Sequence, residues 1–158
     1  MDKKYIIYVG NFSFPLGNAS GKRVYGNGCI FRELGYETIF IGMDSKVQKE
    51  TPLEETRKTY DGFDYYNLNY PAGSAEWLDF HSVFLKLTQW LDTKKHQIFA
   101  IVFYGSLRLS PFISKMINWA RKNEIKTISD CVDWLESKTG NLAFDVVKNL
   151  DTFYQKAI

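Results

Sequence analysis

The chain has 158 residues, of which 45% are hydrophobic, 16% aromatic and 24% charged, a composition that fits one globular domain and excludes a disordered or low-complexity chain. Its 20 basic and 18 acidic residues are mixed along the sequence, so no basic stripe predicts nucleic-acid binding. Two cysteines, Cys29 and Cys131, are too few for a disulfide framework, and their apolar surroundings predict core thiols in a reducing compartment. The first apolar run stops at Gly10, too soon for a signal peptide or a membrane span. We therefore expect a cytoplasmic protein whose weak positive charge permits peripheral contact with the inner face of the membrane.

The first half of the chain predicts three strands and one long helix. In chain order they are a strand at 4–9 closed by Gly10, a helix within 20–34 stopped by Gly35, a strand at 38–41, and a strand at 63–68 that ends before Pro71. The segment 43–61 is rich in charge, and we interpret it as a solvated loop with one helical turn.

The second half predicts three helices and two strands. Ser74 is the predicted cap of a helix whose apolar stripe is Trp77, Phe80, Phe84, Leu87 and Leu91, and an unbroken apolar strand follows at 98–103. Ser110 and Pro111 begin the next helix, and 126–129 is the fifth strand. A last helix is predicted from the spacing of Leu142, Val146, Leu150 and Tyr154. Strand and helix alternate throughout.

This alternation predicts a Rossmann-like, doubly wound parallel sheet covered by helices on both faces, with strand order 3-2-1-4-5. Ligands of such sheets bind beyond the carboxyl ends of the strands, where the winding reverses. Here the reversal falls between the first and fourth strands. The loops expected at that crevice are 10–20, 104–109 and 130–136.

The loop 11–23 follows a strand and opens a helix, a position at which glycines and free amides hold phosphate in many α/β proteins. It lacks a full P-loop pattern, and the Gly26-Asn27-Gly28 run lies too far inside the helix for a dinucleotide fingerprint. Lys22 and Arg23, basic residues in a first turn, favour an anionic ligand. The structural alternative is a tight turn at Gly17 and Asn18 with Ser20 as the helix cap, and Gly26 and Gly28 letting the helix approach the sheet.

Carboxylates recur every three residues at Asp130, Asp133 and Glu136, where they would bind sugar hydroxyls or exchange protons, or else cap a turn and meet solvent. No histidine or cysteine cluster accompanies them, so we expect no metal. His81 and His96 are interpreted as structural or solvent-facing. Phe12 and Phe14 are core residues by default, as aromatic residues mainly are. Because their place in the first loop makes them harder to bury, the other interpretation is that they stack on a ligand or on another domain.

Taken together, several segments resemble the amino-terminal half of retaining glycosyltransferases of family 4, the group 1 type, from bacterial capsule or cell-wall polysaccharide synthesis. The segments are Phe14-Pro15 with Gly17-Asn18-Ala19, Arg23-Val24, Leu34 to Thr38, Tyr70-Pro71, Ser74 to Trp77, and Asp130 to Trp134. Each motif is loose, and the resemblance depends on their order along nearly the whole chain.

The resemblance implies one Rossmann-like domain, residues 1–158, of a two-domain GT-B hexosyltransferase that moves a sugar from a nucleotide-diphosphate donor to a glycan or lipid-linked acceptor without a cofactor. It implies that Gly17, Asn18, Ala19 and Arg23 approach the donor diphosphate and that Tyr104, Ser106, Asp133 and Glu136 meet the acceptor. Asp130 stands where many members have a catalytic histidine, so it is the candidate catalytic residue, although the role of that histidine does not transfer directly to a carboxylate. The donor-binding carboxy-terminal domain would lie outside this chain, and the isolated half would be inactive.

Two further interpretations stay open. A stand-alone flavodoxin-like module that binds a nucleotide or phosphate is the main alternative, and a P-loop NTPase is disfavoured by the short glycine loop. The predicted last helix reaches Ile158 without a capping glycine, which indicates a fragment of a longer protein. The sugar, the nucleotide base and the linkage are not encoded in any motif found here.

Overall fold

A computed structural model describes residues 4–70, 80–104 and 110–131. Within these ranges, only the backbone is described for Phe80–Ser82 and Ser110–Pro111, at the starts of their helices. The elements in chain order are β1 (Tyr5–Gly10), α1 (Ala19–Glu33), β2 (Glu37–Asp44), the 3₁₀ helix η1 (Leu53–Thr56), β3 (Lys58–Tyr60), β4 (Phe63–Asn69), α3 (Phe80–Asp92), the 3₁₀ helix η2 (Lys95–Gln97), β5 (Ile98–Tyr104), α4 (Ser110–Lys122) and β6 (Lys126–Asp130). The predicted Ser74 cap and the predicted helix from Leu142 to Tyr154 lie outside the described residues.

The six strands form one sheet in the order β3-β4-β2-β1-β5-β6, and every pairing except that of β3 is parallel. The five predicted strands thus occupy the predicted order 3-2-1-4-5, and the α/β class is confirmed. The winding reverses between β1 and β5, as expected.

Strand β3 lies within residues 43–61, which the charged composition predicts to be a loop, so the prediction is wrong for this strand. It is a three-residue antiparallel edge strand joined to β4 by a tight turn in which Asp61 (φ 48°) and Gly62 (φ +77°) both have positive φ. Two consecutive positive φ angles are typical of the hairpin turn that fits strand twist. The charged composition that suggested a loop also suits a short, solvent-facing edge strand. The helical turn expected in the same segment is present as η1.

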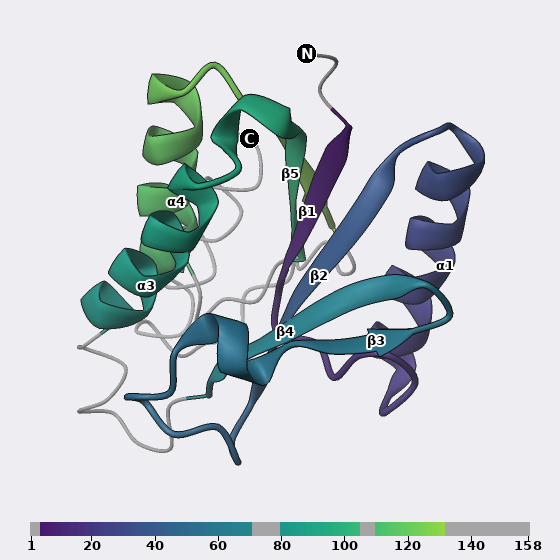
Figure 1. Ribbon diagram of the computed structural model, residues 1–158, viewed down its shortest axis with the longest axis horizontal. Coiled ribbons are helices and arrows are strands. Elements are labelled where there is room, and N and C mark those ends of the chain that lie inside the picture. Colours follow the sequence, from purple (N-terminus) through teal and green to yellow (C-terminus); the bar gives the residue numbers. More distant parts are fainter. Residues whose placement is uncertain (1–3, 71–79, 105–109, 132–158) are drawn as a thin grey trace, which may run out of the picture.

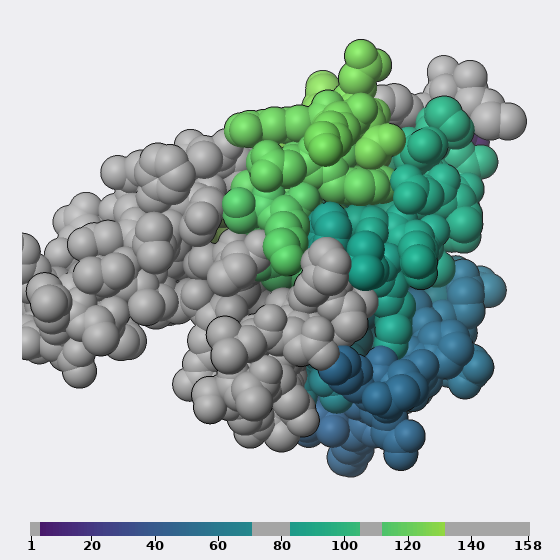
Figure 2. All heavy atoms as spheres, turned by 90° about the vertical axis from the view of Figure 1, so that its left-hand side faces the viewer, coloured from purple at the N-terminus to yellow at the C-terminus, as the bar shows by residue number. Residues whose placement is uncertain are grey.

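The helices cover both faces of the sheet. Figure 1 shows α1 on one side of the strands and α3 with α4 on the other. Figure 2 looks onto the second side, where α4 (green) lies beside α3 (teal). Two buried clusters result: one between the sheet and α3–α4, which includes Leu87, Leu91 and Met116, and one under α1, which includes Tyr8 and Phe40. Together they form the three-layer arrangement that a parallel sheet requires.

Local signals set both ends of α1. Asn18, not Ser20, is the N-cap: its side-chain oxygen accepts hydrogen bonds from the Gly21 amide at 2.8 Å and the Ser20 hydroxyl at 2.6 Å. Gly35 has φ +86°, and the amides of Gly35 and Tyr36 bond back to carbonyls of the last turn, so the predicted glycine stop is confirmed.

Two of the three glycines of α1, Gly26 and Gly28, differ in their surroundings. A β-carbon added at Gly28 would lie 2.4 Å from the Cζ atom of Phe40, so Gly28 does let the helix approach the sheet. An added β-carbon at Gly26 would have no atom within 4 Å. The close-approach interpretation is confirmed for Gly28 and wrong for Gly26.

The aromatic residues of the first loop are core residues. Phe12 is 1% exposed and Phe14 is 8% exposed, and the Phe14 ring stacks on Phe40 with centroids 4.1 Å apart. The expectation that they stack on a ligand or another domain is therefore wrong. The loop folds back over β1 and β2 and buries both rings in the cluster under α1.

Candidate functional site

The carboxyl edge of the sheet brings β1, β5 and β6 together next to the start of α1. Gly10 and Tyr104, the last residues of β1 and β5, are paired, and an added Gly10 β-carbon would lie 2.4 Å from the Tyr104 carbonyl oxygen. Tyr104 in turn pairs with Asp130, the last residue of β6. The reversal of winding therefore places Asp130 at the strand ends where doubly wound sheets bind ligands.

Asp130 is the centre of a buried polar cluster. Its carboxylate accepts a hydrogen bond from the hydroxyl of Tyr8 on β1, and one from Asn27 Nδ2 on α1 at 3.3 Å. Arg23, one turn before Asn27 on α1, donates from Nη2 at 2.5 Å and from Nε at 3.1 and 3.2 Å. Asn27 Nδ2 also donates to the Tyr8 hydroxyl at 2.9 Å. Side chains from two elements, β1 and α1, thus converge on the carboxylate at the end of β6, which has only 7% of its side chain exposed.

The electrostatics of this cluster fix two protonation states. Burial, followed by the hydrogen bond to Asp130, raises the pKa of Tyr8 far above its usual value, so its hydroxyl stays protonated and acts as a donor. The hydrogen bonds and the charge of Asp130 raise the pKa of Arg23, which stays cationic. The bidentate contact also orients the guanidinium plane, because two donors meet the two carboxylate oxygens.

This geometry bears on the expected catalytic role of Asp130. Both carboxylate oxygens accept hydrogen bonds, one from Arg23 alone and the other from Tyr8, Asn27 and Arg23. Donors thus occupy both oxygens of Asp130, whereas the Arg23 side chain is 47% exposed. Catalysis by Asp130 remains a prediction that the structure does not test.

The glycine loop is held mainly by itself. Gly17 lies against Ser13, with an added β-carbon 3.0 Å from the Ser13 Cβ atom, and Gly21 lies against the Ser13 carbonyl oxygen. The Gly21 amide is taken by the Asn18 side chain, and Ala19 is the first residue of α1. These contacts match the tight-turn interpretation of Gly17 and Asn18, with the cap moved from Ser20 to Asn18. Binding of a diphosphate by Gly17, Asn18, Ala19 and Arg23 stays a prediction.

The expected acceptor residues divide between described and masked parts of the chain. Tyr104 is 9% exposed at the end of β5, and its ring meets the Phe12 ring edge-on with the centroids 6.0 Å apart. Tyr104 also lies close enough to Arg23 to contribute to the raised pKa of Arg23. Ser106, Asp133 and Glu136 lie outside the described residues, so their predicted roles are not examined by the structure.

Two members of the cluster had no signal strong enough to select them. Tyr8 lies in an uninterrupted apolar strand and looks like any core aromatic residue. Asn27 stands four residues after Arg23, which puts both on one face of α1, but nothing in the sequence says which strand that face meets.

Other expected features can be checked in the described residues. Within 4–70, 80–104 and 110–131, no group of three or more metal-binding side chains converges. His96 is exposed on η2, in line with the solvent-facing interpretation, and both cysteines are half-buried rather than fully packed in the core. None of the helices in these ranges combines the length and apolar character needed to span a membrane.

Comparisons with known proteins show the fold and overturn the family resemblance. No protein-family model and no curated protein matches the chain. In structure it is similar to the crystal structure of the C-terminal domain of a hydrogenase from Pyrococcus furiosus, with a TM-score of 0.52, 10% sequence identity, and coverage of 83% of this chain and 93% of that one. At that identity the likeness establishes the α/β fold alone.

The resemblance to family 4 glycosyltransferases is therefore wrong. The order of strands, helices and glycine loop on which it depended is common to doubly wound folds in general. The loop residues that seemed most specific, Gly17 and Asn18, are accounted for by a turn and a helix cap.

Proposed function

We propose that this chain is a binding module for a small anionic ligand, of the phosphate or nucleotide class, held at the carboxyl edge of the sheet by Arg23. The observation that supports the proposal is the pairing of a half-exposed guanidinium with a buried carboxylate at the reversal of winding. The buried Asp130 fixes the orientation of Arg23, and the protonated Tyr8 and the Asn27 amide fix Asp130.

The physical basis is preorganisation. An exposed arginine loses side-chain entropy when it binds an anion, and an arginine already held by a fork of hydrogen bonds loses less. The remaining guanidinium donors meet a phosphate or carboxylate with fixed geometry. The start of α1 adds the positive end of its helix dipole beside Arg23.

The experiment is a titration of the 158-residue chain, labelled with ¹⁵N, with inorganic phosphate, pyrophosphate, ADP and UDP in turn. We expect at least one of them to shift the amide signals of Arg23, Asn27 and Asp130. The variant Arg23→Gln should bind that ligand about tenfold or more weakly. Absence of binding by all four anions contradicts the proposal, as does equal affinity in the variant.

Arg32→Gln is a matched control. Arg32 lies on the same helix, is 48% exposed and is paired with Asp61, but it is away from the carboxyl edge. Because Arg23→Gln leaves Asp130 buried without its cation, the double variant Arg23→Gln/Asp130→Asn is tested alongside it. Loss of binding in this double variant, with a native amide spectrum, separates the ligand effect from unfolding.

Sugar transfer stays a prediction, although the family resemblance that implied it is wrong. Its donor, its acceptor and the activity of the isolated chain are also untested. No contact in the described residues favours it over simple binding. Incubation of the chain with UDP-glucose and a glycan acceptor would test sugar transfer. A transfer product would show that the chain is catalytic as well as a binding module.

A further inference from the structure

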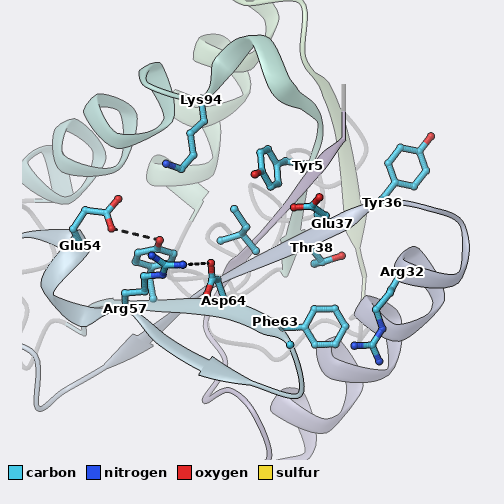
Figure 3. A pocket seen from close by; sticks show the side chains of 13 residues that line it. Tyr5, Arg32, Tyr36, Glu37, Thr38, Glu54, Arg57, Phe63, Asp64 and Lys94 are labelled. Carbon is cyan, nitrogen blue, oxygen red and sulfur yellow. Dashed lines mark hydrogen bonds and ion pairs between the residues drawn. The ribbon is translucent and has the colours of Figure 1, made fainter. Parts of the chain in front are cut away.

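A cavity lies at the opposite, amino edge of the sheet, and neither Arg23 nor Asp130 lines it. Strands β2 and β4 begin at Glu37 and Phe63, but they pair with each other only from Phe40 and Tyr65 onward. The first residues of the two strands are therefore not paired with each other. A cavity of about 340 Å³ opens at this fork (Figure 3). Its size falls in the range of small-molecule sites, roughly 300–1,000 Å³.

The cavity wall is charged but balanced. It contains three cationic side chains, Arg32, Arg57 and Lys94, and three acidic ones, Glu37, Glu54 and Asp64. The rings of Tyr5, Tyr36, Phe63 and Tyr66 and the side chain of Ile39 supply the apolar surface. Aromatic rings with a few convergent charged groups are typical of sites for small polar ligands.

Four of the six charged groups already have partners. Arg57 and Asp64 form an ion pair at 2.7 Å, and Arg32 is paired with Asp61. Glu54 accepts a hydrogen bond from the Trp90 indole at 2.5 Å and a longer one from the Tyr66 hydroxyl at 3.5 Å. These contacts fix the positions of the four side chains in the cavity wall.

Lys94 and Glu37 are the remaining pair. Among the described residues neither has an ion-pair partner: the Lys94 ammonium lies over the Trp90 ring at 4.9 Å, and Glu37 faces the neutral hydroxyl of Tyr5. Figure 3 shows the two side chains reaching the cavity from different elements, with Tyr5 between them. One positive and one negative group are therefore presented to the same space.

We propose that this cavity binds a small zwitterion of the α-amino acid class. Its carboxylate meets Lys94, its ammonium meets Glu37 with the Tyr5 ring beside it, and Ile39 and Tyr66 contact its side chain. A ligand with a single charge would bury one of the two wall groups against nothing of opposite sign, which is unfavourable, whereas a zwitterion matches both. The site is separate from the proposed anion site, which lies at the other end of the strands.

The test is a titration of the full 158-residue chain with each of the twenty standard L-amino acids, followed by ¹⁵N amide shifts. We expect one or more to bind and to move the signals of Glu37, Asp64 and Lys94 but not those of Arg23 and Asp130. Lys94→Gln and Glu37→Gln should each weaken the binding about tenfold. Lys95→Gln, at the next residue, which is outside the cavity wall, should leave it unchanged.

Derivatives of the amino acid that binds test the charge requirement directly. Its methyl ester and its N-acetyl form each lose one charge, and both should bind at least about tenfold more weakly. The proposal is overturned if no amino acid binds, if either derivative binds as tightly as the parent, or if Lys94→Gln has no effect. Binding that is lost in Arg23→Gln but kept in Lys94→Gln would place the amino acid at the carboxyl edge and also overturn it.

Discussion

Two glycines on one helix provide a sharp test of how α1 packs on the sheet. Replacing Gly26 by alanine should stabilise the protein by about 0.5–1 kcal/mol, because alanine is the better helix former and its methyl group meets no atom within 4 Å. Replacing Gly28 by alanine brings the same propensity gain. There, however, the new methyl group would lie 2.4 Å from the Phe40 Cζ atom and 3.3 Å from both Cε atoms.

Phe40 has no room to move away. Its side chain is fully buried, stacked on Phe14 at 4.1 Å and meeting Phe63 edge-on at 5.4 Å. Overpacking of this kind costs about 1–3 kcal/mol, or more where the neighbours are rigid, so Gly28→Ala should be destabilising by about 1–2 kcal/mol after the helix gain is subtracted.

Urea unfolding of the 158-residue chain, followed by circular dichroism, measures both variants against the unaltered protein. The two alanine variants should differ by roughly 1.5–3 kcal/mol in unfolding free energy. If Gly28→Ala is as stable as Gly26→Ala, α1 does not lie on Phe40 as described, and the packing of the whole face is wrong.

Three further variants test polar groups in the core. Tyr8→Phe removes the hydroxyl that donates to Asp130 and accepts from Asn27, and it should lower the unfolding free energy by about 1.5–3 kcal/mol in urea titrations; an unchanged midpoint would show that the cluster does not stabilise the fold. Thr38→Val removes a buried hydroxyl oxygen that has no hydrogen-bond partner among the described residues, so we expect the melting temperature to rise by an amount equivalent to about 1 kcal/mol. A fall would mean that the hydroxyl has a partner. Burial, with the charge of Glu54, raises the pKa of Tyr66 to about 12, so above pH 10 the unfolded chain loses this proton before the folded chain does. Stability should therefore fall from about pH 10 to pH 12 with a slope of up to about 1.4 kcal/mol per pH unit from this group, and Tyr66→Phe should have a shallower alkaline slope in unfolding measured across that range.

The sequence by itself determined the fold class, the order of the five main strands and the C-terminal end of α1. These features depend on signals that act within a few residues: apolar runs for strands, a period near 3.6 for helices, a glycine at the helix stop. Handedness and the covering of both faces then leave few arrangements of the sheet. The short strand β3 escaped because three polar edge residues give no apolar alternation.

Only the tertiary structure decided what the polar groups do. Arg23 and Asp130 are 107 residues apart, and Tyr8 and Asp130 are 122 apart, so their meeting depends on strand order and on the rotation of α1 about its axis. The path of the loop before α1 buries Phe14 on Phe40, so that a residue expected to meet a ligand belongs to the core. The fork between β2 and β4 arises from the register of these two strands, and it brings Lys94 and Glu37 to the wall of one cavity. No sequence pattern in either strand predicts this register. Local patterns fix which segments form strands and helices, whereas sites form where distant segments pack, and packing is a property of the whole chain.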